Sequence, residues 1–278
     1  MASPLRRAAV AGSWYPGRPD ALKSEIEGYL AGVPPLSVPG RLVGLISPHA
    51  GFRYSGPVAA YGYSLLKGLR DVTVVLVGPS HRIGFEGVAV YARGAFETPL
   101  GTIPIDAELG AALLEAEDEL LDDPRPHRDE HSLEIQLPFL QYFVSGLRIV
   151  PCLMGTQGRH EVDKLAAALA RALAGRHALL VASSDLSHYH PARVANERDA
   201  LVVSDVGHFD AEGLMKRLER SWDCACGGGP IVAVMNAARA LGADTATVLR
   251  YADSGDAGEH DKSRVVGYLS AALSAASA

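Results

Sequence analysis

The sequence predicts an α/β fold, a three-layer α/β/α sandwich around a largely parallel or mixed sheet. Three continuous apolar runs rich in valine, isoleucine and leucine are typical of strands buried on both faces, and they cover residues 42–46, 72–77 and 178–182. Segments with helical spacing of apolar residues separate these runs. Strands that alternate with helices on this scale indicate helices on both faces of one sheet.

The remaining elements follow from the same patterns. Helices are expected at residues 20–30, 57–69, 107–116, 161–173, 211–218 and 230–241. Further strands are expected at residues 87–91, 147–153, 245–251 and 264–269. Turn-forming residues within 96–105 predict a hairpin or ordered loop, and the acidic, proline-rich residues 117–126 predict a surface excursion. Another helix is expected to begin at Glu130, with a bend at Pro138.

Composition narrows the class of protein. The 278 residues are 48% hydrophobic and 21% charged, which is typical of a globular protein with a sizeable core. We expect a single domain over residues 1–278, because no linker, repeat or low-complexity tract divides the chain. The net charge is −6 and no run of lysines or arginines occurs, which argues against partners such as nucleic acid or anionic membranes.

Targeting and redox signals point to the cytoplasm. No apolar run approaches the roughly 18 residues of a membrane span. The apolar stretch after Arg7 is too short for a secretory signal. Three cysteines in a chain of this length make a poor disulfide framework, which favours a reducing compartment. We therefore predict a cytoplasmic protein.

Two histidines follow predicted strands in matching contexts. His49 comes after the first apolar run and His81 after the second, each preceded by proline and, for His81, one small residue. Open α/β sheets bind ligands beyond the carboxyl ends of their strands, and neutral imidazole is the commonest metal ligand in proteins. The pair therefore favours a metal site over ordinary loop histidines bonded to backbone.

Asp185 and His188 follow the third apolar run. They are three residues apart, so one helical turn would place both on the same face. A carboxylate beside an imidazole fixes its tautomer and raises its basicity, which suits either a metal ligand or a general base. The alternative is that Asp185 caps a helix and His188 lies on that helix's surface.

Cys226 precedes three glycines and a predicted apolar helix. Backbone amides at a helix N-terminus lower the pKa of a thiol, so this residue is a candidate ligand or nucleophile. The alternative is a buried structural thiol, the role that we assign to Cys152. The glycines do not form a phosphate loop, because no Gly-Lys-Ser/Thr follows them.

His131 and Glu134 stand one turn apart in the helix expected from Glu130. They can share a site, or they can form a solvated helix end. Their spacing is not the His-Glu-x-x-His pattern of zinc proteases. The other histidines without a comparable context are expected to be surface or packing residues; they are His127, His160, His177, His208 and His260.

Six segments are similar, in the same order, to segments of the Memo family, whose fold resembles that of the class III extradiol dioxygenases. The matching segments cover residues 11–16, 48–56, 78–81, 130–140, 184–189 and 226–227. They extend over nearly the whole chain. The resemblance implies one Memo-like domain with a dioxygenase-like pocket.

The resemblance also implies roles for single residues. His49, His81 and Cys226 would bind a metal, with His188 beside it in the acid/base position and His131 lining the pocket. The dioxygenases bind non-haem iron through two histidines and a glutamate, so Cys226 stands where they have a carboxylate. A thiolate is softer, which favours copper(I), zinc or a redox-tuned iron, and it is open to oxidation where O2 is activated. We expect iron first, with copper or zinc as alternatives.

Three functions compete. The first is a redox-active, metal-dependent oxidoreductase with a small-molecule substrate, in which His188, oriented by Asp185, moves protons. The second is a non-catalytic module that binds a peptide or phosphopeptide in the same pocket, with Trp14 stacking and Arg53 pairing with phosphate. The third is a zinc-assisted hydrolase with His188 as the base.

Overall fold

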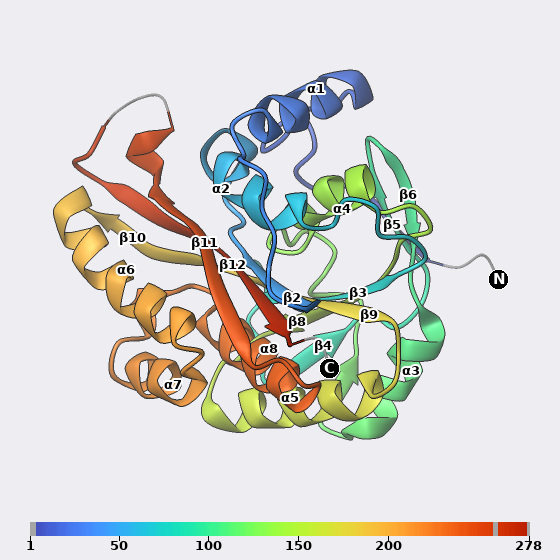
Figure 1. Cartoon of the computed structure of the whole chain (residues 1–278). Coiled ribbons are helices and arrows are strands. Elements are labelled where there is room, and N and C mark those ends of the chain that lie inside the picture. The colour runs from blue at the N-terminus through green and yellow to red at the C-terminus, as the bar shows by residue number, and fades with distance from the viewer. Residues whose placement is uncertain (1–3, 258–260, 277–278) are drawn as a thin grey trace.

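A central sheet lies between two groups of helices in the computed structural model, which describes residues 4–257 and 261–276 (Figure 1). One group packs on the first face and comprises α1 (Pro19–Leu30), α2 (Phe52–Ser64) and α4 (Leu137–Phe143). The other face is covered by α3 (Ala107–Ala116), α5 (Arg159–Leu173), α6 (Ala192–Gly207), α7 (Ala211–Arg220) and α8 (Gly228–Ala240). The predicted three-layer α/β/α architecture is therefore confirmed.

The sheet is mixed. Its strands follow the order β10–β12–β2–β9–β3–β8–β4–β7, and β11 pairs with β12. Their bounds are β2 (Arg41–Ser47), β3 (Thr73–Pro79), β4 (Val88–Val90), β7 (Leu120–Asp122), β8 (Arg148–Met154), β9 (Ala178–Ser183), β10 (Asp185–His190), β11 (Thr245–Asp253) and β12 (Val265–Ala275). The four central strands β2, β9, β3 and β8 are parallel, whereas β12 runs antiparallel to β2 at one end of this group and β4 runs antiparallel to β8 at the other.

The central strands form because both of their faces are covered. Every residue of β3 is buried, and its side chains alternate between the two layers. Val75 and Val77 belong to the core beneath α5 and α8, while Val74 and Leu76 belong to the core beneath α2 and α4. Because successive strand residues point to opposite faces, a strand between two helical layers needs an unbroken apolar run.

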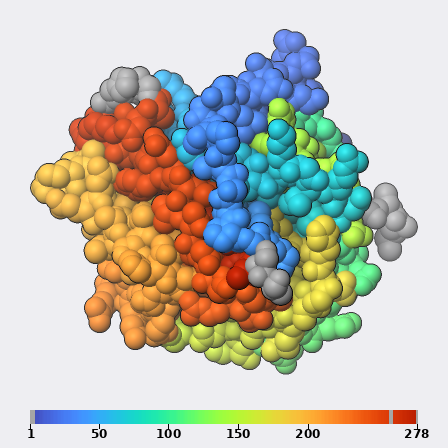
Figure 2. All heavy atoms as spheres, viewed as in Figure 1, coloured from blue at the N-terminus to red at the C-terminus, as the bar shows by residue number. Residues whose placement is uncertain are grey.

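Smaller elements complete the fold. A second sheet contains β1 (Leu5–Arg6), β5 (Ala95–Thr98) and β6 (Gly101–Pro104), and its antiparallel β5–β6 pair is the expected hairpin. The 3₁₀ helices are η1 (Glu134–Gln136), η2 (Trp222–Cys224) and η3 (Ser254–Asp256). Figure 2 shows the C-terminal strands in red beside the blue segment around β2, so opposite ends of the chain meet in one sheet.

The structure corrects three expected elements. Residues 117–126 are not only a surface excursion, because β7 within them pairs in parallel with β4 at the sheet edge. No helix begins at Glu130; regular structure starts with η1, and α4 follows with Pro138 in its first turn, where a missing N–H is tolerated. Asp185 and His188 do not share a helical turn, because β10 pairs antiparallel with β12 in an irregular register.

Two further observations concern helices. The 16-residue α6 was not expected, and its buried residues are Ala195, Asp199, Val202 and Val206. Within residues 4–257 and 261–276, no helix combines the length and apolar character required to cross a membrane.

Candidate functional site

A pocket of about 970 Å³ opens beyond the carboxyl ends of the central parallel strands. The residues singled out from the sequence that line it are Trp14, His49, Arg53, His81, His131, Asp185, His188 and Cys226. Glu134 is the one residue of that expected set that does not line it. The fold therefore gathers residues from most of the chain at the sheet edge where α/β proteins bind ligands.

His49, His81 and Cys226 present donor atoms to one another. His49 follows β2, His81 follows β3, and Cys226 precedes α8. One ring nitrogen or sulfur of each residue lies within 4.8 Å of those of the other two. Nε2 of His49 is 3.1 Å from Sγ of Cys226. Two imidazoles and one thiol therefore converge on a common point at the pocket wall.

His49 is almost fully buried and held on two sides. Oδ1 of Asp185 accepts the backbone N–H of His49 at 2.7 Å and that of Ala50 at 3.3 Å. On the ring, Nδ1 lies 2.9 Å from Oγ of Ser183. Burial, followed by the neighbouring histidines, holds the pKa of His49 well below its ordinary value, so the ring is neutral.

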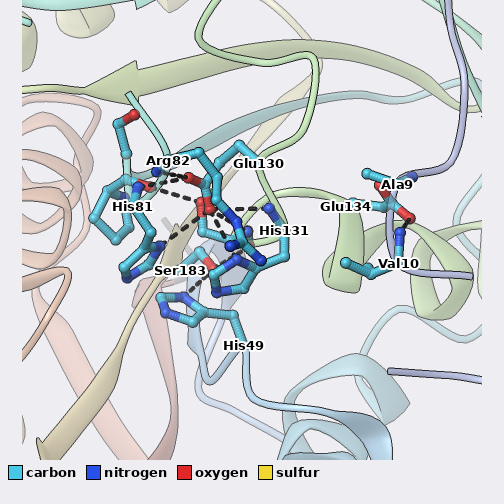
Figure 3. A network of polar contacts seen from close by, with 12 residues as sticks. Ala9, Val10, His49, His81, Arg82, Glu130, His131, Glu134 and Ser183 are labelled. Carbon is cyan, nitrogen blue, oxygen red and sulfur yellow. Dashed lines mark hydrogen bonds and ion pairs between the residues drawn. The ribbon is translucent and has the colours of Figure 1, made fainter. Parts of the chain in front are cut away.

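His81 is oriented by a buried carboxylate. Its Nδ1 lies 3.0 Å from Oε1 of Glu130 (Figure 3). The same carboxylate accepts the backbone N–H groups of His81, Arg82, His131 and Ser132. Burial opposes its charge, but the hydrogen bond from His81 and the two nearby imidazoles hold the pKa of Glu130 below its usual range. A carboxylate in this position fixes the ring orientation of a metal-ligating histidine.

Sequence reasoning missed Glu130 as a site residue. Its side chain is 1% exposed, although a glutamate beside Asp129 and His131 looks like a surface residue. The available signal was position, since Glu130 opens a segment that resembles a family motif.

Cys226 and Asp185 are in contact through backbone and sulfur. The backbone N–H of Asp185 donates to Sγ of Cys226 at 3.3 Å. Burial, followed by the charge of Asp185, raises the pKa of the thiol, and burial raises the pKa of the Asp185 carboxyl to about 6. The expected lowering of the thiol pKa at the start of α8 is therefore wrong for the metal-free protein, because desolvation outweighs the helix terminus.

His188 lies in the pocket wall, but its orientation does not come from Asp185. Its Nδ1 lies 2.8 Å from the carbonyl oxygen of Leu186. Because a carbonyl only accepts, Nδ1 carries the proton and Nε2 is the ring nitrogen that can take one. Asp185 instead bonds to the backbone at His49 and Ala50.

Aromatic rings and one arginine form the adjoining wall. The ring of His131 lies 4.3 Å from that of Trp14 and 4.6 Å from that of His81, measured between centroids. Burial lowers the pKa of His131 to about 4. The guanidinium of Arg53 lies 5.7 Å from the Tyr54 ring centroid. Trp14 and Arg53 thus face the same pocket as the histidines.

Glu134 has a different place from the one expected. Its buried carboxylate pairs with Arg6 and accepts the backbone N–H of Ala9 at 2.8 Å and of Val10 at 3.0 Å (Figure 3). It also accepts the hydroxyl of Tyr15 at 2.7 Å. Glu134 therefore anchors the N-terminal segment that carries Trp14, and it does not reach the pocket.

The remaining expectations are settled more simply. Cys152 is fully buried in β8, as a structural thiol should be. His127 is also buried, with Nε2 at 3.1 Å from the carbonyl oxygen of Ala89. His260 lies outside the described residues.

The donor set fits a bound metal ion. Two imidazoles and one thiol are ligands that zinc, copper(I) and iron accept, and three protein ligands leave a coordination position open. A second cluster of possible ligands comprises His81, Glu130 and His131. It fits less well, because backbone N–H groups already occupy the Glu130 oxygens.

Comparison with known proteins gives a consistent family. A family model described as "Memo-like protein" matches residues 6–272. A MEMO1 family protein of Methanothermobacter thermautotrophicus is 39% identical over 274 residues, covering 95% of this chain and 98% of that protein. A MEMO1 family protein of Pyrobaculum aerophilum is 38% identical over 275 residues, covering 96% and 98%.

A solved structure has a related fold. The uncharacterized protein JW3007 of Escherichia coli K12 matches with a TM-score of 0.55 and 16% sequence identity. The match covers 82% of this chain and 99% of that protein. At this identity the likeness concerns the fold alone.

Proposed function

This chain belongs to the Memo family, and we propose that it is a metal-dependent redox enzyme that holds iron or copper at His49, His81 and Cys226. The observation that carries the proposal is the convergence of these three donor groups in the wall of a pocket of about 970 Å³. Such a volume admits a small-molecule substrate.

Besides the three candidate ligands, His188, Trp14 and His131 have tasks in this proposal. A bound iron or copper ion would supply one-electron chemistry and an open position for O2 or substrate. His188 takes or gives a proton at Nε2, since Leu186 holds its Nδ1–H. The rings of Trp14 and His131 exclude water from one side of the site.

Metal analysis of the purified protein tests the proposal. The protein is prepared without chelator or nickel resin, and its iron, copper and zinc contents are measured beside His49→Ala and Cys226→Ala. Cys224→Ala and His160→Ala are matched controls, because neither residue lines the pocket. We expect near-stoichiometric iron or copper in the parent and the controls, and its loss in both site variants. Full metal content in the site variants would contradict the ligand assignment.

Oxygen uptake then tests turnover. Metal-loaded protein is given catechols and other small O2-dependent substrates, and O2 consumption is compared with His188→Ala. A substrate-dependent rate that falls at least tenfold in the variant supports a proton-transfer role, in line with the contributions of about 10²–10⁴ typical of positioned acids and bases.

Peptide binding is the second candidate function. Trp14 and Arg53 both line the pocket, and stacking and phosphate pairing suit a phosphorylated side chain. In this case a phosphotyrosine peptide library binds equally well with and without chelator, and Trp14→Ala abolishes binding. Retained affinity in Trp14→Ala would count against this function.

A further inference from the structure

Among the four pocket histidines, the Nδ1 atoms of His49, His81 and His188 each lie at hydrogen-bonding distance from a partner, and these partners are of two kinds. His81 faces a carboxylate and His188 faces a backbone carbonyl, both at hydrogen-bonding distance. These groups accept only, so Nδ1 carries the proton in both rings. His49 faces the hydroxyl of Ser183, which can either donate or accept. The direct partner therefore does not determine the tautomer of His49.

The other neighbours of Ser183 remove this ambiguity. Its Oγ lies 2.6 Å from the carbonyl oxygen of Ser132 and 2.8 Å from Nε2 of Gln136. The carbonyl accepts only, so it takes the single hydroxyl proton, while the Gln136 amide donates to Oγ. Toward His49, Oγ of Ser183 can therefore only accept a hydrogen bond, so Nδ1 of His49 must donate it.

The orientation of the Gln136 amide is itself fixed. Nε2 donates to the carbonyl oxygen of Pro48 at 3.0 Å, and Oε1 accepts the hydroxyl of Tyr63 at 2.6 Å. A flipped amide would set its oxygen against the Pro48 carbonyl, so the network selects the arrangement described. Gln136, Ser183 and His49 are 1%, 0% and 2% exposed, which leaves little access for water to replace these bonds.

We infer that Ser183, aligned by Gln136 and the Ser132 carbonyl, is a positioning residue that holds His49 in the Nδ1–H tautomer. Nε2 then keeps its lone pair directed toward Cys226 and His81. The opposite tautomer would place a proton where a metal must bind. The inference rests on the proposed function for its purpose, but the tautomer itself is a property of the metal-free protein.

Nitrogen NMR reads the tautomer directly. Protein labelled with ¹⁵N-histidine is freed of metal, and long-range ¹H–¹⁵N spectra at pH 7.5 distinguish protonated from unprotonated ring nitrogens. The His49→Ala spectrum assigns the His49 signals. We expect Nδ1 protonated and Nε2 unprotonated in the parent protein. A protonated Nε2 in the parent overturns the inference without any further variant.

Variants and cobalt titration test the role of the serine. In Ser183→Ala, Nδ1–H loses its acceptor, so we expect a shift toward the Nε2–H tautomer and a Co²⁺ affinity lower by about ten- to a hundredfold. Gln136→Met should have a smaller effect, because the Ser132 carbonyl still takes the Ser183 proton. Ser47→Ala is the matched control, because Ser47 lies opposite Ser183 in the β2–β9 register and does not bond to His49.

The outcomes separate this inference from the proposed function. Parental tautomer and cobalt affinity in Ser183→Ala overturn the positioning role. If Ser183→Ala does not fold, the parent spectrum tests the tautomer, and the tautomer and cobalt affinity of Gln136→Met test the positioning role. If the parent shows the expected tautomer but binds no cobalt, the tautomer assignment stands and the metal proposal fails. If the parent binds cobalt but shows the opposite tautomer, the metal proposal stands and the tautomer assignment fails.

Discussion

Glu130 and Glu134 lie four residues apart, and both carboxylates are buried, yet they serve different regions (Figure 3). Glu130 holds His81 and the backbone beside it at the pocket. Glu134 holds Arg6 and the N-terminal segment on the other side of the same chain segment. The pocket region thus contains a carboxylate that orients a candidate ligand. The carboxylate of Glu134 only ties chain segments together, and we call Glu134 with its partners Arg6, Ala9 and Val10 the anchor region.

The difference lies in what neutralises each charge. Glu134 has a guanidinium partner, so its removal leaves a buried cation. Glu130 is stabilised by backbone N–H groups and the ring of His81, so its removal leaves unpaired donors and a loosened ring. Burial alone therefore does not reveal whether a carboxylate belongs to a site; its partners do.

The largest effect on stability is expected at the anchor. Glu134→Ala leaves Arg6 buried without its partner and should lower the free energy of unfolding by about 3–5 kcal/mol. Urea denaturation measures this loss. Cobalt affinity of the folded variant should stay within about twofold of the parent, because Glu134 does not line the pocket. A large change in affinity would erase the distinction between the two regions.

The next effect is expected at the pocket. Glu130→Gln keeps the side-chain shape but turns an amide N–H toward backbone donors and removes the charged acceptor of His81. Cobalt affinity should fall by about ten- to a hundredfold, the usual effect of losing such a partner. Titration of metal-free protein measures it, with Glu134→Gln as the paired comparison. Equal affinities in these two variants would contradict the assigned roles.

The stability contributed by the anchor region should also depend on pH. His127 belongs there, because its backbone carbonyl accepts Nε–H of Arg6 at 2.8 Å. Burial lowers the pKa of its ring to about 3. In the unfolded chain the His127 ring binds a proton below about pH 6.5, whereas in the folded protein it stays unprotonated down to about pH 3. The folded state therefore loses stability as the pH falls from about 6.5 toward 3.

The contribution of His127 between pH 8 and pH 5 should be about 2 kcal/mol. His127→Gln keeps a donor for the Ala89 carbonyl and should remove this part of the slope. Urea denaturation at both pH values measures the difference. Parallel slopes in parent and variant would show that the ring does not titrate as its burial indicates.

The smallest effect on stability is expected at the exposed ion pair of Arg7, the residue next to Arg6. Arg7 pairs with Glu97 at 3.2 Å, but 78% of the Arg7 side chain is exposed. Glu97→Ala should change the free energy of unfolding by no more than about 1 kcal/mol, because solvent and salt screen such pairs. Denaturation beside Glu134→Ala compares an exposed and a buried ion pair of adjacent arginines. A similar loss in both would mean that burial does not set the difference.

Much of the fold could be predicted because the central strands are buried on both faces. The apolar runs at residues 42–46, 72–77 and 178–182 lie in β2, β3 and β9, except that Val72 directly precedes β3. β10 was missed because Ser187, His188 and His190 break any apolar pattern and its register is irregular. β7 was missed because it is a three-residue edge strand among acidic residues.

The candidate site could be predicted only in part. Histidines and a cysteine after strand ends are visible in a sequence, because their chemistry is specific and strand ends converge. Glu130 was not visible, since its partners include a ring 49 positions away. Gln136 left one usable signal: it is a polar residue inside an apolar segment, and such residues need buried partners.

The order of the ligands along the chain sets when the site can exist during synthesis. His49 and Cys226 are 177 positions apart, and β12, which separates β10 from β2, follows both. A nascent chain that has already exposed His49 and His81 still lacks the thiol and the strand that completes the sheet. In the proposed function, metal capture would therefore follow synthesis of β12, and a loaded site would mark a completed sheet.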